Sequence, residues 1–284
     1  MAHNILTRYA DMALPATDYA ERLGACLQLG FIPSDAACIA QAWQAQIART
    51  GNTTDWPADP ADFGIRPHPR SDVFAACPQQ LGLYAVLPDA AWVGRMARAG
   101  VPTVQLRFKS TDQQAIQAEV RAAVAAVQGT DALLFINDHW QAAIDAGAYG
   151  VHLGQEDMEA LSAADVLAIR SAGLRLGLST HGYAEMLRAD AFSPSYIALG
   201  AVFPTTLKRM ATAPQGLARL HAYARLMRGT PLVAIGGINN TQMAAVLASG
   251  VGAVAVVRAL TGAADPEAAA AHLLALVQQH LTPL

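Results

Sequence analysis

Between residues 81 and 257, the chain alternates short, continuously apolar runs with alanine-rich segments of helical period. A run that is apolar throughout is typical of a strand covered by other elements on both faces, as in a parallel sheet. The pattern therefore predicts repeated βα units and an α/β fold. The runs lie at 81–87, 103–108, 133–138, 150–154, 174–180, 196–200, 232–237 and 254–257.

Eight βα units in about 200 residues favour a closed TIM (β/α)8 barrel over an open doubly wound sheet, which usually has five or six strands. The crossover between the third and fourth runs is short, so we expect its helix to have only about two or three turns. This barrel, the expected catalytic domain, would span residues 81–284.

The first 80 residues have a different pattern. Their spacing predicts one helix ending near Leu29 and a second from Ser34 to just before Gly51. We expect an N-terminal helical appendage over 1–50. Residues 51–80 are rich in Pro, Gly and Asp and form either an extended linker or an ordered wrap on a neighbouring surface.

Composition narrows the class of partner. With 53% hydrophobic residues and a formal net charge of -3, the 284-residue chain has a large core and no broad basic field for nucleic acid. No window offers about 18 uninterrupted apolar residues, and the first residues lack the apolar segment of a signal peptide. The three cysteines have no CxxC spacing, which argues against a zinc site. We expect a cytoplasmic protein that acts on small molecules without a membrane.

Polar side chains follow most of the apolar runs at the point where each run ends. In a βα barrel, the carboxyl ends of the strands and the loops after them form one mouth, so these residues converge in space. The candidates are Gln105, Arg107, Lys109, Asn137, Asp138, Gln155, Asp157, Ser179, Thr180, His181, Thr205, Thr206, Lys208, Gly236 and Gly237.

Two carboxylates at the mouth indicate a metal site. Asp138 and Asp157 follow neighbouring strands, and hard oxygen ligands of this kind suit Mg²⁺, which takes one or two carboxylates together with substrate phosphates. Considered in isolation, the two residues could equally be helix caps.

Cations near the carboxylates favour an anionic ligand. Arg107 and Lys109 are two apart on an extended segment, so their side chains leave the same face. The alternative is a surface ion pair with Asp112. Lys208 lies in a loop long enough to act as a lid, and the alternative is an ordinary solvated loop.

Gly236 and Gly237 follow the seventh run, ahead of a helix expected from about Thr241. Backbone N–H groups there can approach a phosphate, at the position where barrels commonly bind one; tight-turn geometry is the alternative.

His181 could carry a proton or make a structural hydrogen bond. His152, inside the fourth run, is more simply a packed core residue.

The motifs at these positions resemble those of the thiamine-phosphate synthase family over residues 81–277. The resemblance implies a TIM-barrel transferase that joins hydroxymethylpyrimidine diphosphate to a thiazole phosphate and releases pyrophosphate before the thiazole nitrogen captures the pyrimidine carbocation. The matching stretches, in chain order, are QLRFK, FINDHWQAAI, GVHLGQED, GLSTH, ALGAVFPTTLK, APQGL, VAIGGI and GVGAVAVV.

Site roles follow from the resemblance, motif by motif. It implies that Asp138 and Asp157 hold Mg²⁺ and that Gln105 and Ser179 lie near the pyrimidine. It places Gly237, with Gly236, at the thiazole phosphate. The residues expected to bind the diphosphate are Arg107, Lys109, Asn137 and Lys208. Arg107, Lys109 and Lys208 are expected to be catalytic together with Ser179, and His181, Thr205 and Thr206 are expected to bind substrate.

Two positions depart from the family pattern. Leu207 stands in PTTLK where the family commonly has a second threonine, so one hydroxyl contact to the diphosphate would be missing unless a shift of the loop lets Thr206 supply it. Arg258 replaces the serine that usually follows the eighth strand; backbone donors survive this change, and the added cation would either strengthen binding of the thiazole phosphate or crowd it.

These departures leave two alternatives open: a thiazole tautomerase-like isomerase and a non-catalytic phosphate-binding regulatory barrel. A homo-oligomer and a carboxylated thiazole substrate are also left open.

Overall fold

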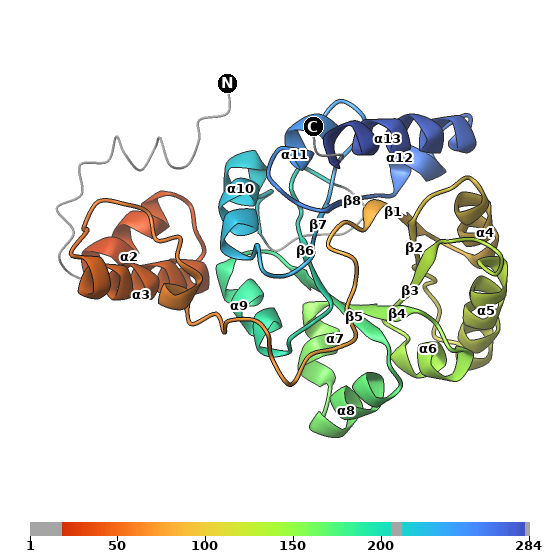
Figure 1. The fold of residues 1–284 in the computed structure, drawn as a ribbon, viewed down its shortest axis with the longest axis horizontal. Coiled ribbons are helices and arrows are strands. Elements are labelled where there is room, and N and C mark those ends of the chain that lie inside the picture. Colours follow the sequence, from red (N-terminus) through yellow and green to blue (C-terminus); the bar gives the residue numbers. More distant parts are fainter. Residues whose placement is uncertain (1–18, 206–211, 282–284) are drawn as a thin grey trace.

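The computed structural model describes residues 19–205 and 212–281, and within them eight parallel strands close into a barrel. The first and last strands pair directly, with Gly82 opposite Ala253. The predicted TIM barrel is therefore confirmed (Figure 1). The strands are β1 (Gly82–Leu87), β2 (Thr103–Leu106), β3 (Leu133–Asn137), β4 (Gly150–Leu153), β5 (Arg175–Thr180), β6 (Tyr196–Leu199), β7 (Leu232–Ile235) and β8 (Ala253–Val256).

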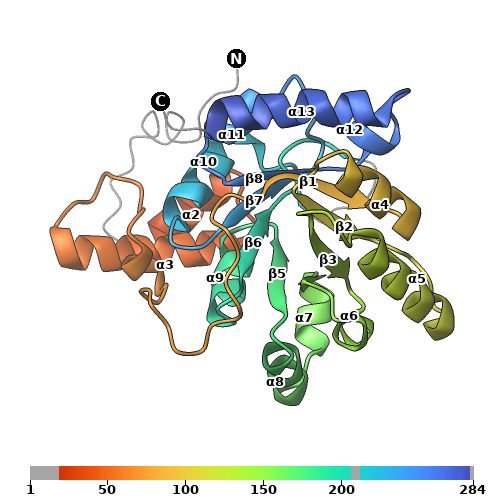
Figure 2. The same cartoon turned by 45° about the vertical axis from the view of Figure 1, so that its right-hand side comes forward.

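Helices surround the barrel and cover the outer faces of its strands (Figure 2). Asp89, Asp112 and Ser162 cap three of them, each accepting a hydrogen bond from a backbone N–H of the first turn. The helices are α4 (Ala90–Arg98), α5 (Gln113–Ala126), α6 (Trp140–Ala146), α7 (Gln155–Ala160), α8 (Ala163–Ser171), α9 (Tyr183–Ala191), α10 (Gly216–Leu226), α11 (Met243–Leu247), α12 (Arg258–Thr261) and α13 (Pro266–Leu281).

Alternate residues of each strand point into the barrel, where aromatic rings fill the centre. Tyr84, Phe135 and Tyr196 are almost completely buried there, and the rings of Phe135 and Tyr196 meet edge to face at 5.1 Å. Glycines on β4 and β5, Gly150 and Gly177, leave the space that these two rings occupy. Burying each ring contributes about 2 kcal/mol, which gives the barrel a rigid interior beneath its mouth.

Ahead of the barrel, α2 (Tyr19–Gln28) and α3 (Pro33–Thr50) form a helical pair that lies beside α9 and α10 (Figure 1). Gly51 ends α3 in the left-handed conformation, as its sequence predicts. A short 3-10 helix, η1 (Pro60–Phe63), follows. The division of the chain at residues 50 and 80 into separate units stays a prediction.

Residues 72–80 run across the amino end of the barrel. The backbone N–H of Phe74 donates to the carbonyl of Ser193 (3.2 Å), and Oγ of Ser195 donates to the carbonyl of Ala75 (2.6 Å). Residues 72–80 therefore cover part of the amino end, and the strand ends that carry the predicted site residues lie at the opposite, carboxyl end. Among the described residues, no helix has both the length and the apolar character that a membrane crossing requires.

Candidate active site

The register of β3 and β4 brings the two halves of the predicted metal site together. Asn137 pairs with His152, and the backbone N–H of Asp138 donates to the carbonyl of His152 (3.0 Å). Asp138 has a φ of 65°, a left-handed conformation that is uncommon outside glycine and that often marks functional sites. The carboxylate of Asp138 thus leaves the end of β3 beside the start of α7.

The carboxylates of Asp138 and Asp157 interact at the mouth. Burial raises the pKa of Asp157, and the negative charge of Asp138 raises it further, against the opposing effects of Gly154 and Lys109. Oδ2 of Asp157 also accepts a hydrogen bond from the backbone N–H of Gly154 (3.0 Å). Asp157 is therefore a helix cap as well as one member of a carboxylate pair.

Lys109 supplies a positive charge to this pair. Its Nζ lies 2.6 Å from Oδ2 of Asp138, so Lys109 pairs with a strand-end carboxylate and not with Asp112. The side chain of Lys109 is 58% exposed and that of Asp138 25%, so this ion pair adds little to stability. The effect of this ion pair is on the site: it keeps the Lys109 ammonium beside Asp138, close enough to lower the pKa of Asp157 as well.

The donor set suits Mg²⁺. Within 19–205 and 212–281, no cluster of three or more His, Cys, Asp or Glu side chains could hold a metal alone. Mg²⁺ does not need such a cluster, because it commonly takes one or two carboxylates and completes its shell with water and substrate phosphate. Asp138 and Asp157 supply two carboxylates that repel each other, and Lys109 balances only part of their charge. This pair provides the carboxylate ligands that Mg²⁺ commonly takes from a protein.

Two arginines lie at the mouth on either side of β1. Arg107 directly follows β2, where its backbone N–H donates to the carbonyl of Leu87 (2.7 Å), and its side chain is half-buried. Arg258 begins α12 after β8 and is exposed. Thr205 is half-buried in the loop after β6. Thr206, Leu207 and Lys208 lie outside the described residues.

A buried chain of hydrogen bonds runs across the barrel just beneath the mouth. Nε2 of Gln105 donates to the hydroxyl of Tyr84 (2.9 Å), which lies 2.8 Å from the hydroxyl of Tyr196. His152 joins Tyr196 to Ser179, with Nδ1 2.7 Å from the Tyr196 hydroxyl and Nε2 2.8 Å from Oγ of Ser179. The chain therefore links Gln105 on β2 to Ser179 on β5, both of which are expected near the pyrimidine.

Burial keeps the two tyrosine hydroxyls of this chain neutral. It raises the pKa of Tyr84 and raises that of Tyr196 well above the ordinary value, so both hydroxyls stay protonated. Sequence reasoning did not select Tyr84 or Tyr196, and it treated His152 only as a packed residue. The signal that could have found them is the polar atom that each carries within an otherwise apolar strand, β1, β4 or β6, since side chains along a strand alternate between the barrel interior and its outer face.

The two glycines after β7 are required by the loop after β6. Gly236 and Gly237 have φ of 103° and 67°, and an added Cβ on Gly237 would lie 2.5 Å from the carbonyl oxygen of Pro204. The backbone N–H of Phe203 donates to the carbonyl of Gly236 (2.9 Å). α11 begins at Met243, two residues later than expected. The tight-turn geometry is thus present, and phosphate binding by these glycines stays a prediction.

Comparison with known proteins assigns the barrel to a family. A sequence model described as thiamine monophosphate synthase matches residues 83–260. The chain belongs to this family. It is 58% identical over 188 residues to a thiamine-phosphate synthase of Neisseria meningitidis serogroup B, covering 66% of this chain and 90% of that protein. It is 51% identical over 205 residues to a thiamine-phosphate synthase of Serratia proteamaculans, and this match covers 72% of this chain and 95% of that protein.

A solved structure agrees with the assignment. The thiamine phosphate pyrophosphorylase of Pyrococcus furiosus superposes with a TM-score of 0.63 at 28% identity, covering 71% of this chain and 98% of that one. The resemblance carried by the motifs is therefore confirmed. The match to the thiamine monophosphate synthase family begins at residue 83, so residues 1–82 lie outside it.

In this family member, His181 makes a structural contact. Its backbone N–H and its Nδ1 lie 2.9 and 2.6 Å from Oε2 of Glu185 in the first turn of α9. Burial opposes ionisation of Glu185, but hydrogen bonds and charge from His181 outweigh it, so the pKa of Glu185 is lowered. Gln155 supports the same strand end, since its Nε2 donates to the carbonyl of Ser179 (2.6 Å).

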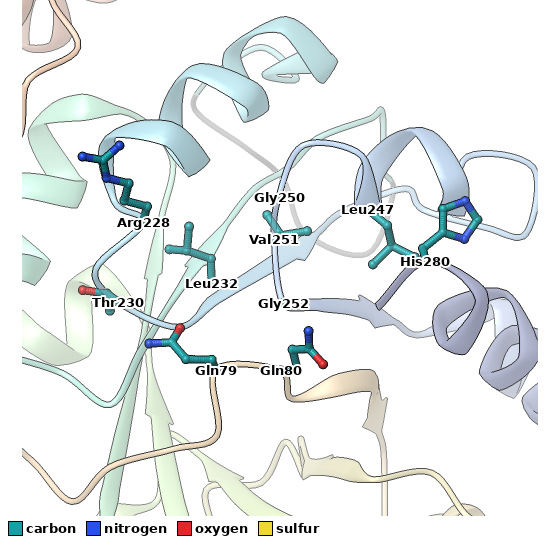
Figure 3. A pocket seen from close by; sticks show the side chains of 10 residues that line it. All are labelled: Gln79, Gln80, Arg228, Thr230, Leu232, Leu247, Gly250, Val251, Gly252 and His280. Carbon is teal, nitrogen blue, oxygen red and sulfur yellow. The ribbon is translucent and has the colours of Figure 1, made fainter. Parts of the chain in front are cut away.

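A hollow of about 380 Å³ lies at the opposite end of the barrel, near the amino ends of β7 and β8 (Figure 3). It contains none of the predicted site residues. The synthase chemistry is therefore not placed there. Its lining residues are Gln79, Gln80, Arg228, Thr230, Leu232, Leu247, Gly250, Val251, Gly252 and His280.

Proposed function

We propose that this chain is a transferase that condenses hydroxymethylpyrimidine diphosphate with a thiazole phosphate to give thiamine phosphate and pyrophosphate. The observation that carries the proposal is the juxtaposition of Lys109, Asp138 and Asp157 at the mouth, where the Lys109 ammonium lies 2.6 Å from Asp138. Family membership over residues 83–260 supports the same reaction.

The charged mouth would hold the diphosphate. Arg107 can bind it in a bidentate manner and Lys109 as a compact charge, with Asn137 beside them and Lys208 expected from the loop after β6. Asp138 and Asp157 would hold Mg²⁺, which neutralises charge on the diphosphate oxygens when bound. Substrate entry would draw Lys109 from Asp138 toward phosphate, because the diphosphate offers the ammonium group more negative charge than one carboxylate does.

The buried chain beneath the mouth would hold the pyrimidine. Gln105 and Ser179 present an amide and a hydroxyl to its ring nitrogens and amino group, and His152 fixes the Ser179 hydroxyl at 2.8 Å. Fixed polar groups of this kind lower the barrier, because they need no reorganisation during the reaction.

Two bonds change in the reaction. The bond from the pyrimidine methylene carbon to the diphosphate oxygen breaks, and its electron pair leaves with pyrophosphate. The lone pair of the thiazole nitrogen then forms the new carbon–nitrogen bond. No protein nucleophile is needed, and the residues named at the mouth bind and stabilise the departing anion. Gly236, Gly237 and Arg258 would hold the thiazole phosphate.

An assay of the purified full chain with both substrates and Mg²⁺ tests this proposal. Formation of thiamine phosphate and pyrophosphate in equal amounts is the expected result. Isomerisation of the thiazole without condensation would instead indicate a tautomerase, and binding without conversion would indicate a regulatory barrel. Either of these results would overturn the proposal.

A further inference from the structure

The N-terminal segment contributes a carboxylate to the barrel at the edge of the mouth. Asp35, in the first turn of α3, is only 3% exposed, and its Oδ1 accepts a hydrogen bond from the backbone N–H of Ala184 (2.9 Å). Ala184 is the second residue of α9. A residue from outside the family match therefore caps a helix of the barrel.

The barrel leaves space for this carboxylate. The N-cap residue of α9 is Gly182, and an added Cβ there would lie 2.7 Å from Cγ of Asp35. Its φ of 171° is ordinary extended backbone, so glycine is needed at this position for space and not for conformation. Gly182 itself offers no side chain to cap α9, and Asp35 supplies the missing acceptor.

Aromatic packing surrounds the first residue of α9, next to the Asp35 cap. The ring of Tyr183, the first residue of α9, stacks on Phe63 at 5.3 Å and contacts Phe31 at 6.0 Å. The indole of Trp56 donates to the hydroxyl of Tyr183 (3.3 Å). From α10, Arg219 lies over the ring of Phe31 at 4.1 Å. The cap therefore belongs to a packed interface between the N-terminal segment and the barrel.

The capped end of α9 is continuous with the predicted pyrimidine site. Only residues 180–182 separate Ser179 from Tyr183, and the same helical turn holds His181 through Glu185. A shift at the start of α9 would therefore move the Ser179 hydroxyl and the His181 ring.

We propose that Asp35 positions the active site by fixing the start of α9 and thereby the placement of Ser179 and His181. Asp35 is a positioning residue, since it lies behind the mouth and contacts backbone of α9. The inference rests on the proposed function for its catalytic consequence, but the placement of His181 can be measured without turnover.

The other end of α9 offers a matched control. Arg70, also from the N-terminal segment, pairs with Asp190 in the last turn of α9 at 2.8 Å, and both side chains are about as buried as Asp35. Its guanidinium also donates to the carbonyl of Asp190 (2.9 Å). Arg70→Met therefore loosens the same interface at the end of α9 farther from the mouth.

Full-length Asp35→Ala, Asp35→Asn and Arg70→Met should be compared below their unfolding temperatures. We expect Asp35→Ala to lower kcat/KM for the pyrimidine diphosphate about tenfold or more, because small displacements of reacting groups are costly. Asp35→Asn keeps an acceptor oxygen and should stay within about threefold of the parent. Arg70→Met should lower the unfolding temperature at least as much as Asp35→Ala, yet keep kcat/KM within about twofold.

Two further measurements keep the inference testable if Asp35→Ala folds poorly or the parent shows no turnover. Gly182→Ala should displace the Asp35 carboxylate from the barrel side and mimic Asp35→Ala, while the double variant should be no worse than Asp35→Ala alone. The imidazole ¹⁵N signals of His181 should shift in Asp35→Ala and Gly182→Ala but not in Arg70→Met. Unchanged His181 signals and unchanged kcat/KM in Asp35→Ala would overturn the inference, whereas an inactive parent with shifted signals would refute only the proposed function.

Discussion

The imidazole of His152 joins the hydroxyl of Ser179 to the centre of the barrel: its Nε2 lies 2.8 Å from Oγ of Ser179. The other ring nitrogen is 2.7 Å from the hydroxyl of Tyr196, so the ring is held on both sides. One determinant of the Ser179 orientation therefore lies in the rigid interior of the barrel, beside the backbone connection from Ser179 to α9.

Replacing His152 with Phe should lower kcat about fivefold to tenfold, because the Ser179 hydroxyl loses a hydrogen bond of about 1 kcal/mol. Steady-state kinetics of His152→Phe, Ser179→Ala and the double variant check this. The double variant should be no slower than the slower single variant, because both changes act on the same group. Thr103→Val serves as the control: it removes a buried hydroxyl that donates to Leu81 (2.7 Å) at the far end of the barrel and should leave kcat unchanged.

Removing either carboxylate of the predicted metal site should lower turnover about a hundredfold or more. Asp138→Asn and Asp157→Asn keep size and an acceptor oxygen but remove the charge that would hold Mg²⁺. The measurement is the initial rate of pyrophosphate release across a Mg²⁺ titration. Asp112→Asn is the matched control, since Asp112 caps α5 after β2 and Asn caps equally well. Parent-like rates in both site variants would reject the metal assignment.

The same substitution at Asp157 should not cost stability. The pKa of the Asp157 carboxyl is higher in the folded protein than in the unfolded chain. The protonated side chain therefore stabilises the fold fully at pH values below the unfolded-state pKa, and this stabilisation is lost as the pH rises through the folded-state pKa. At pH 7 the charged form is therefore unfavourable, and Asp157→Asn should unfold at an equal or higher temperature than the parent. That advantage should shrink as the pH falls toward the ordinary aspartate value of about 3.9.

Asp165→Asn provides the contrast for this stability measurement. Asp165 occupies the corresponding position in the first turn of α8, but hydrogen bonds from Ser162 lower its pKa. Its contribution is present above the unfolded pKa and is lost as pH falls, so Asp165→Asn should reduce stability at pH 7. Calorimetry at pH 7 that shows both variants shifted in the same direction would contradict the account of Asp157.

Much of the fold follows from the chain's apolar pattern. The eight runs match the eight strands with ends within two residues, because strands covered on both faces are apolar throughout. The short crossover before Gly150, predicted to hold a helix of only about two or three turns, contains α6, a helix of seven residues. These features are local in sequence, so periodicity and turn residues suffice to find them.

The contacts that sequence reasoning missed join distant parts of the chain. Asp35 caps α9 across 149 positions, and His152 reaches Tyr196 across 44. Neither pairing leaves a periodic signal. The partner of Lys109 was also open, since Asp112 is nearer in sequence. In the structure the ammonium lies 2.6 Å from Asp138, which follows β3 with a positive φ that its sequence does not predict.

Gly236→Ala should reduce both stability and affinity for the thiazole phosphate. The φ of 103° disfavours any side chain, and an added Cβ would lie 2.5 Å from Cβ of Ala201. Gly250→Ala is the control, because its φ of 92° carries a similar backbone cost but the space around it is open. We expect a loss of about 1–2 kcal/mol for Gly250→Ala and a larger loss for Gly236→Ala. Denaturant unfolding gives the two values, and equal losses would contradict the packing argument.

Diffraction from crystals soaked with Mn²⁺ and pyrophosphate tests the central claim, that the mouth holds a divalent cation against the leaving group. Mn²⁺ takes the oxygen ligands of Mg²⁺ and has an anomalous signal. We predict one anomalous peak bound by the carboxylates of Asp138 and Asp157, with pyrophosphate oxygens completing its shell and Nζ of Lys109 turned toward phosphate. A peak elsewhere, or pyrophosphate bound without any metal at these two carboxylates, would contradict the account.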